Sequence, residues 1–197
     1  PEAGSDATSQ RTTAIDKGDH YLLNGTKNWI TNGSTASTFL VIAQTDVEKG
    51  HRGINAFIVE KDWAGFDVSA KEDKLGIRGS DTHTLVFTDV KVPKENRIGE
   101  DGFGFKFAMK VLEGGRIGIA AQALGIAAGS YELALNYSKE RETFGKPINQ
   151  HQAIQFKLAD MFIEVENARN LVHKAAWHKD NGMDYSISGA MAKLHAS

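Results

Sequence analysis

The chain has 197 residues, of which 41% are hydrophobic and 24% are charged, and its formal net charge is −2. This balance excludes a disordered protein and argues against a nucleic-acid binder that needs a broadly basic face. Cysteine is absent, which excludes disulfides, thiolate catalysis and cysteine-bound metals, and the seven histidines show no metal-like spacing. No apolar run approaches the length of a membrane span, so we expect none.

Composition changes near residue 100. Residues 1–100 contain 25 Val, Ile and Thr residues against 11 in residues 101–197, whereas Ala rises from 8 to 15. β-branched residues favour strands and Ala favours helices. We therefore predict an α+β protein in which an antiparallel β-barrel or sandwich over residues 1–100 precedes part of an α-helical bundle over residues 101–197.

Short β-rich runs separated by turn residues fill the first half. Asn24-Gly25 is a strong hairpin signal, so we predict one strand up to residue 23 and a returning strand over 26–31. Further strands are expected over residues 38–44, 54–59, 66–70 and 84–92, with Pro93 ending the pattern.

The second half is predicted to hold three helices. The first runs from about residue 102 to 141, with Gly114-Gly115 as a weak point, and residues 143–149 form a loop. Asn149-x-x-Gln152 resembles a capping arrangement before a second helix whose apolar residues keep a three-to-four spacing. A third helix starts near Tyr185 and still runs at the last residue. The chain also begins without Met, so we expect a piece of a longer or processed protein.

The Trp29-Ile30-Thr31 run is the first candidate site. In an extended strand, Trp29 and Thr31 project from one face and Ile30 from the other. A flat indole beside a hydroxyl can hold a planar heteroaromatic ring, with the indole packing on the ring and the hydroxyl reaching a ring nitrogen. The plainer interpretation, ordinary sheet packing with Trp29 in the core, is favoured by spacing alone.

Glycine-containing segments give weaker signals. Ala3-Gly4-Ser5-Asp6 is either a loop whose backbone approaches a ligand or a simple turn. Phe103-Gly104-Phe105 lacks the spacing of a dinucleotide-binding fingerprint, and the sequence contains no Walker loop. A Rossmann-type site is therefore discarded.

Charged side chains on the predicted helices give two further candidates. Glu113 and Arg116 share a helix face, where they form either a weak surface ion pair or the lining of a cleft for a polar ligand. Arg141 ends the first helix, where it either complements the helix dipole or binds a phosphate through its forked donors.

Six segments, in order and at matching intervals, resemble the acyl-CoA dehydrogenase family. The likeness covers essentially the whole chain and is greatest for the short-chain (butyryl) and short/branched-chain members. The segments are PEAGSD (1–6), NGTKNWITN (24–32), KLGIR (74–78), VKVP (90–93), GRIGIA (115–120) and RETFGK (141–146).

The resemblance implies a larger flavoenzyme with an N-terminal helical domain, a middle β-domain and a C-terminal four-helix domain, assembled as a homotetramer with FAD at subunit interfaces. Residues 1–100 would form the middle β-domain, and residues 101–197 the first part of the C-terminal bundle. The implied reaction converts a short-chain acyl-CoA thioester to trans-2-enoyl-CoA. A carboxylate removes the α-proton, the β-hydrogen leaves as hydride to flavin N5, and electrons pass to an electron-transfer flavoprotein.

The same resemblance implies the FAD contacts. Trp29 matches the Trp that packs at the flavin ring, and Thr31 the hydroxyl that hydrogen-bonds N5, while Ile30 contributes backbone. Ser5 matches a residue whose loop touches both flavin and acyl-CoA.

A second set of FAD contacts is implied across a subunit interface. Arg141 resembles the Arg that reaches the FAD pyrophosphate of a neighbouring subunit, and Gln152 another FAD contact there. Thr143 and Phe144 would flank them.

The substrate channel is implied to involve Glu113, Gly115 and Arg116. Some family members place the catalytic carboxylate where this chain has Gly115, which cannot act as a base. The chain therefore resembles the larger group whose Glu lies late in the C-terminal domain, and we assign no catalytic residue and no metal ligand.

Two alternatives stay open. An acyl-CoA oxidase would use the same flavin and pass electrons to oxygen, whereas the 197 residues by themselves could be an inactive scaffold fragment that lacks the base. The resemblance implies a cytoplasmic protein in a bacterium or a mitochondrial-matrix protein in a eukaryote.

Overall fold

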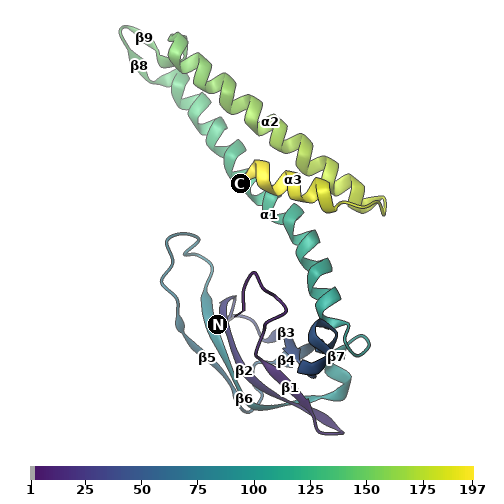
Figure 1. The fold of residues 1–197 in the computed structure, drawn as a ribbon. Coiled ribbons are helices and arrows are strands. Elements are labelled where there is room, and N and C mark those ends of the chain that lie inside the picture. The colour runs from purple at the N-terminus through teal and green to yellow at the C-terminus, as the bar shows by residue number, and fades with distance from the viewer. Residues whose placement is uncertain (1–2) are drawn as a thin grey trace. The chain divides into compact units, whose positions relative to one another are not determined.

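The computed structural model describes residues 3–197 and divides into two compact units, one reaching Met109 and the other spanning Lys110–Ser197. The first unit holds the large sheet and the second is mainly helical, so the α+β class is confirmed (Figure 1). The assignment of functional domains to residues 1–100 and 101–197 stays a prediction.

Seven strands of the first unit form one hydrogen-bonded sheet in the order β5-β6-β2-β1-β3-β4-β7. Neighbouring strands are antiparallel except β1 and β3, which are parallel. The sheet is therefore mixed, whereas a wholly antiparallel sheet was predicted. The strands are β1 (Thr13–Asp16), β2 (His20–Thr31), β3 (Thr38–Gln44), β4 (Ile54–Glu60), β5 (Phe66–Lys71), β6 (Thr82–Pro93) and β7 (Arg97–Ile98).

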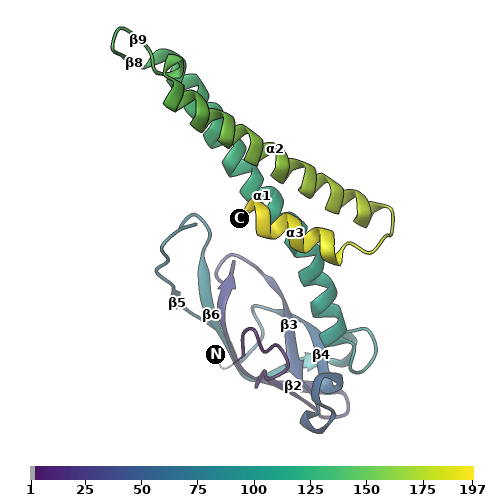
Figure 2. The same ribbon diagram turned by 45° about the horizontal axis from the view of Figure 1, so that its top comes forward.

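The sheet curves so that strands far apart in its order pack their inner faces together (Figures 1 and 2). Phe39 of β3 lies edge-on to Phe66 of β5, with 4.9 Å between the ring centroids. Tyr21 of β2 meets Phe57 of β4 at the same distance. One buried aromatic and aliphatic core therefore fills the inside of the curve, as expected for a barrel-like or sandwich-like arrangement.

Asn24-Gly25 does not form the predicted hairpin turn. Residues 20–31 make a single strand that pairs with β6 along its length, and the pairing shifts by one residue between Leu23 and Gly25, which marks a β-bulge. Gly25 has φ +138°, and an added Cβ would lie 2.8 Å from Thr12 Cα, so only glycine fits there. Asn24 is held by reciprocal hydrogen bonds with Asp89 of β6.

The second unit is built on three helices, α1 (Gly104–Glu140), α2 (Gln152–Asp180) and α3 (Ser186–Ala196). Figure 2 shows α1 and α2 side by side, and Ala120, Leu124, Val165, Ala168 and Val172 belong to the core that joins them. α1 continues unbroken through the two glycines that were predicted to weaken it. Two short strands, β8 (Glu142–Thr143) and β9 (Lys146–Pro147), replace the predicted loop.

The predicted capping arrangement at α2 is wrong, because His151 is the N-cap and makes no side-chain capping bond. Within the described residues 3–197 there are also three 3₁₀ segments, η1 (Val47–Gly53), η2 (Lys94–Asn96) and η3 (Ile148–Gln150).

α1 also corrects the expectation about apolar runs. Among residues 3–197, α1 is the one helix that is both long enough and apolar enough to cross a membrane, judged by length and composition alone. A single helix of this kind is a weak indication, since a core helix of a water-soluble protein passes the same test. The unbroken helix also carries Glu113 and Arg116, both within its length.

Candidate functional site

Trp29, Ile30 and Thr31 form the exposed end of β2. The pairing with β6 shifts again between Lys27 and Ile30, and Trp29 at this second bulge has φ +59°. Trp29 is 64% exposed and Thr31 is also exposed, whereas Ile30 packs against the core of the sheet. The interpretation of Trp29 as a core residue is therefore wrong, and the alternation predicted for these three residues stays a prediction, because the backbone leaves the extended conformation at Trp29.

This geometry leaves an aromatic face and a hydroxyl open to solvent on neighbouring backbone. A bulky residue in the left-handed region is uncommon and costs energy, and burial of the indole within the chain does not repay that cost. An exposed indole beside a hydroxyl is suited to a planar ring that has a hydrogen-bonding nitrogen. The residues present thus fit a flavin-like group.

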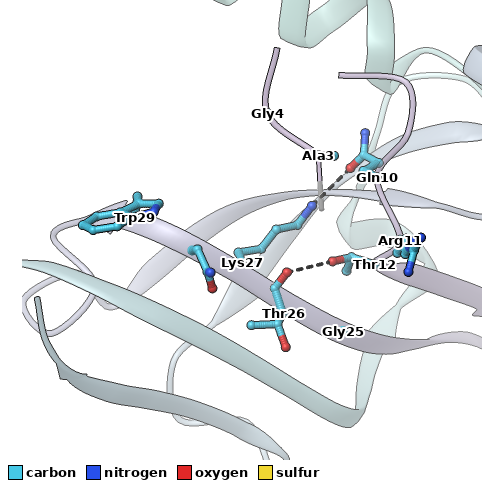
Figure 3. A pocket seen from close by; sticks show the side chains of 10 residues that line it. Ala3, Gly4, Gln10, Arg11, Thr12, Gly25, Thr26, Lys27 and Trp29 are labelled. Atoms are coloured by element: carbon cyan, nitrogen blue, oxygen red, sulfur yellow. Dashed lines mark hydrogen bonds between the residues drawn. The ribbon is translucent and has the colours of Figure 1, made fainter. Parts of the chain in front are cut away.

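A hollow of about 450 Å³ adjoins Trp29 (Figure 3). The loop at residues 3–10 and the middle of β2 form its walls. Ser5 is exposed and directly follows two of the lining residues. The lining residues are Ala3, Gly4, Gln10, Arg11, Thr12, Gly25, Thr26, Lys27, Asn28 and Trp29.

Lys27 is a cation that was not expected inside this hollow. Its Nζ donates to Gln10 Oε1 at 3.1 Å, and Thr12 Oγ1 donates to the Thr26 carbonyl at 3.3 Å, which ties the loop to β2. Burial lowers the pKa of Lys27 to about 8, because the low-dielectric surroundings disfavour the charged form. The part of the chain that is described contains no cluster of acidic or histidine side chains able to hold a metal ion.

The candidate substrate residues lie on α1. The Glu113 carboxylate accepts a hydrogen bond from Ser186 Oγ of α3 at 3.3 Å. Arg116 is exposed, and among residues 3–197 it forms no ion pair with Glu113, so the surface ion pair considered from the sequence is absent. An added Cβ at Gly115 would meet no atom within 4 Å, so the helix surface is open at that point.

The hairpin β8–β9 gathers the other candidate cofactor residues. Phe144 and Gly145 form its two-residue turn with φ +51° and +73°, the positive values that such tight hairpins require. Phe144 is 96% exposed, and its ring contacts His151 edge-on. The Thr143 hydroxyl and His151 Nε2 lie 3.1 Å apart.

Arg141 and Gln152 flank this hairpin, one just after α1 and the other at the first residue of α2. Both side chains are exposed, and the Arg141 backbone carbonyl accepts from Ile148 N at 2.8 Å. The structure therefore brings together Arg141, Thr143, Phe144 and Gln152. It separates them from Arg116, because about 24 residues of helix between Arg116 and Glu140 span roughly 36 Å.

Sequence reasoning missed three features of these regions. A lysine in a predicted strand is expected to be solvated, so nothing indicated that Lys27 would be largely withdrawn from solvent. The left-handed backbone of Trp29 depends on the bulge, which depends in turn on the pairing with β6. The Phe144-Gly145 turn had a signal in its glycine, but phenylalanine is rarely found at such a position.

Two protein-family models match the chain. The middle domain of acyl-CoA dehydrogenase matches residues 1–90, and the C-terminal domain of acyl-CoA dehydrogenase matches residues 102–197. The class defined by the fold and by these matches is a flavoenzyme-type arrangement of a β-domain followed by a helical domain. The chain belongs to the acyl-CoA dehydrogenase family.

Within this family, the chain is similar to short-chain-specific members. The chain is 52% identical over its whole length to a short-chain-specific acyl-CoA dehydrogenase of Clostridium acetobutylicum, covering 52% of that protein. It is 51% identical to the mitochondrial short-chain-specific acyl-CoA dehydrogenase of Homo sapiens, covering 48% of it. The chain thus spans about half the length of the relatives it matches, and these relatives include bacterial and mitochondrial proteins.

Solved structures of related proteins superpose on the whole of this chain. Butyryl-CoA dehydrogenase from Megasphaera elsdenii superposes with a TM-score of 0.97 at 53% identity, over all of this chain and 51% of that one. A chain in a structure described as the electron transferring flavoprotein of Acidaminococcus fermentans has the same TM-score at 54% identity, with 52% of it covered. At 35% identity, the prolyl acyl carrier protein oxidase AnaB gives a TM-score of 0.95, over all of this chain and 52% of its own.

Proposed function

We propose that this chain is the central part of an FAD-dependent acyl-CoA dehydrogenase that oxidises short-chain acyl-CoA thioesters to trans-2-enoyl-CoA. The observation that carries the proposal is the identity of more than half of all residues with short-chain-specific acyl-CoA dehydrogenases, which extends over the whole chain. The exposed segment at Trp29 and Thr31 supports it, because its chemistry fits a flavin ring.

In this proposal FAD, when bound, supplies the acceptor for the hydride that leaves the β-carbon of the thioester. The Trp29 indole would pack on the ring system, the Thr31 hydroxyl would donate a hydrogen bond to a ring nitrogen, and Ile30 would contribute backbone. Ser5 contributes from the loop beside the hollow, where it faces both cofactor and substrate. A donor aimed where negative charge develops lowers the barrier to transfer.

Glu113, Gly115 and Arg116 line the channel for the CoA portion of the substrate, with the Arg116 guanidinium as its cation. Arg141, Gln152, Thr143 and Phe144 contact the FAD of another copy of the protein. The distance along α1 between the two sets supports that division, since one chain presents them roughly 36 Å apart. The proposed assembly is a homotetramer.

The proposed electron acceptor is an electron-transfer flavoprotein. Support comes from the solved structure described under that name, a chain of which shares 54% of its residues with this one. The compartment follows the source, with the bacterial cytoplasm or the mitochondrial matrix as the two proposed locations.

The test is the anaerobic addition of butyryl-CoA to the FAD-loaded full-length protein. Rapid bleaching of the visible flavin absorbance, followed in a stopped-flow instrument, and slower bleaching by acyl chains of eight or more carbons, is the expected result. A full-length protein that binds FAD but is not bleached by any acyl-CoA thioester would refute the proposed reaction.

An acyl-CoA oxidase is the second candidate, and the likeness to the oxidase AnaB favours keeping it in the test. Turnover of butyryl-CoA is measured in air, with peroxide detected, and again with an artificial electron acceptor. The dehydrogenase is expected to need the acceptor and to release little peroxide. Peroxide formed in step with each enoyl-CoA would establish the oxidase instead.

A further inference from the structure

Two residues in the left-handed region bracket the candidate flavin contacts. Trp29 has φ +59° and Asn32 has φ +61°, with Ile30 and Thr31 between them. Such backbone persists where the surrounding structure holds it in place. The exposed Trp29 indole provides little of that hold, so it must come from Ile30 in the core and from the chain that faces this segment.

Asp81, which directly precedes β6, makes several hydrogen bonds to the turn that follows Thr31. Its carbonyl accepts from Asn32 N at 3.1 Å. One carboxylate oxygen accepts from both the backbone N and the hydroxyl of Ser34 at 2.9 Å, and the other accepts from Thr35 Oγ1 at 3.3 Å. These bonds, led by the one from Ser34 N, hold the pKa of Asp81 below its usual range. The turn after Thr31 is thus tied to a single carboxylate.

His83 lies next to Asp81 and packs against the same turn. Its ring is buried, and because a carbonyl only accepts, Nδ1 donates to the Ser69 carbonyl of β5 at 2.7 Å. Nε2 lies 3.4 Å from Asp81 Oδ2 and forms an ion pair with it when the ring is protonated on both nitrogens. A Cβ added to Gly33 would lie 2.7 Å from His83 Cβ, so the turn rests directly on this side chain. His83 is also paired with Ile30 in the sheet.

We propose that Asp81 and His83 are positioning residues that hold the Trp29–Thr31 segment in the conformation that receives the flavin ring. The contacts form a connected series from Ser69 of β5 through His83 and Asp81 to the turn that follows Thr31. Neither side chain touches the hollow beside Trp29, so they act through the backbone of β2. The ligand part of this inference rests on the proposed function, whereas the conformational part does not.

The test uses the full-length protein labelled with 5-fluorotryptophan. The ¹⁹F resonance of Trp29 is assigned by its absence in Trp29→Phe. His83→Phe, which keeps the ring volume, and Asp81→Ala are expected to shift or split this resonance in the FAD-free protein and to weaken FAD binding about tenfold. Asp81→Asn keeps an acceptor oxygen for Ser34, so it should stay within about threefold of the parent.

Val90→Ala is the matched control, because Val90 is fully buried in β6 but pairs with Leu23, eight residues along β2 from Thr31. It should lower the melting temperature while leaving the Trp29 resonance and FAD affinity unchanged. If Val90→Ala moved both readouts as far as His83→Phe, the role would be merely structural and the inference would be overturned.

The remaining outcomes separate the two proposals. An unchanged Trp29 resonance in both His83→Phe and Asp81→Ala, or a shifted resonance with unchanged FAD affinity, would overturn the positioning role. If the unaltered protein failed to bind FAD, the proposed function would fail, and the resonances alone would decide whether Asp81 and His83 hold Trp29.

Discussion

At the scale of single residues, Lys27 shows how a site can retain an unfavourable charge. Its ammonium lies in the hollow beside Trp29 with the neutral amide of Gln10 as hydrogen-bond partner, and burial lowers its pKa from 10.5 to about 8. Between those two pH values the unfolded chain binds more protons than the folded one, so stability rises with pH across that window. Below pH 8 the full cost of the buried charge is present.

Lys27→Met should therefore stabilise the full-length protein at pH 7, by on the order of 2 kcal/mol after allowing for the lost bond to Gln10. The advantage should shrink as the pH rises from 8 towards 10.5, where the parent lysine becomes neutral. Urea unfolding at several pH values measures both effects. A difference between variant and parent that stays constant from pH 7 to 10 would show that the burial of this charge has been misjudged.

Thr31→Ala removes the hydroxyl proposed to donate to the flavin. We expect weaker FAD retention and slower flavin reduction by butyryl-CoA, on the order of tenfold or more for the loss of one such donor. Thr31→Ser, which keeps the hydroxyl, is the control and should stay close to the parent. Rapid-mixing absorbance measures the reduction, and an alanine variant as fast as the parent would remove Thr31 from its role.

At the scale of elements, the start of α1 is held by a buried side chain. Asn55 of β4 donates to Thr45 and to Asp101, both at 2.9 Å, and its carbonyl oxygen accepts from Gly102 N at 2.9 Å. The backbone of Gly104 packs so closely on that of Asn55 that an added Cβ would lie 2.4 Å from the Asn55 carbonyl carbon. The helix can begin there only because residue 104 has no side chain.

Gly104→Ala should consequently cost about 2 kcal/mol of folding free energy, since the clash is with backbone that cannot move aside cheaply. Gly79→Ala is the control, because it lies in an open part of the first unit where a Cβ meets nothing within 4 Å. That variant should stay within about 0.5 kcal/mol of the parent. Denaturant unfolding followed by circular dichroism compares them, and equal stabilities would contradict the close packing.

Elements with a strong local pattern were predictable, and those fixed by distant partners were not. The strand over residues 38–44 matches β3 at both ends, and the second helix ends where Asn181-Gly182 indicates. Asn24-Gly25 carries the local signal of a hairpin but becomes a bulge, because β6 pairs with residues on both sides of it. The chain cannot show locally which of these two outcomes its long-range pairing selects.

The candidate site also combines features that a local pattern predicts with features that depend on distant residues. Alternation along a strand predicted that Trp29 and Thr31 share a face, and in the structure both are exposed while Ile30 is partly buried. The contacts of Asp81 and His83 lie about 50 residues away in sequence from the turn that they hold, so no motif could indicate them.

At the scale of the whole molecule, the helical unit leaves large apolar side chains uncovered. Ile126, Leu133 and Leu194 are more than half exposed, and they lie on α1 and α3. Exposed apolar surface of this extent is typical of interfaces. The relatives are about twice as long as this chain, and the proposed enzyme would cover these faces with further chain and with other subunits.

The 197 residues expressed alone should therefore self-associate and show no butyryl-CoA turnover. Light scattering should give a mass that rises with concentration, once circular dichroism has shown native helix content. Leu133→Gln should reduce the association, whereas Glu132→Gln, an exposed neighbour on the same helix, should not. A monomer of constant mass, or robust turnover by the isolated chain, would contradict this.

The roles proposed for Trp29, Ile30 and Thr31 all require that FAD binds at this segment, and an FAD titration of the full-length protein measures that binding. The parent, stripped of flavin and reconstituted, should bind one FAD per chain, and Trp29→Ala should bind it at least tenfold more weakly with its fold intact by circular dichroism. A parent that stays colourless after reconstitution, or a Trp29→Ala variant that binds FAD as tightly as the parent, would contradict the account.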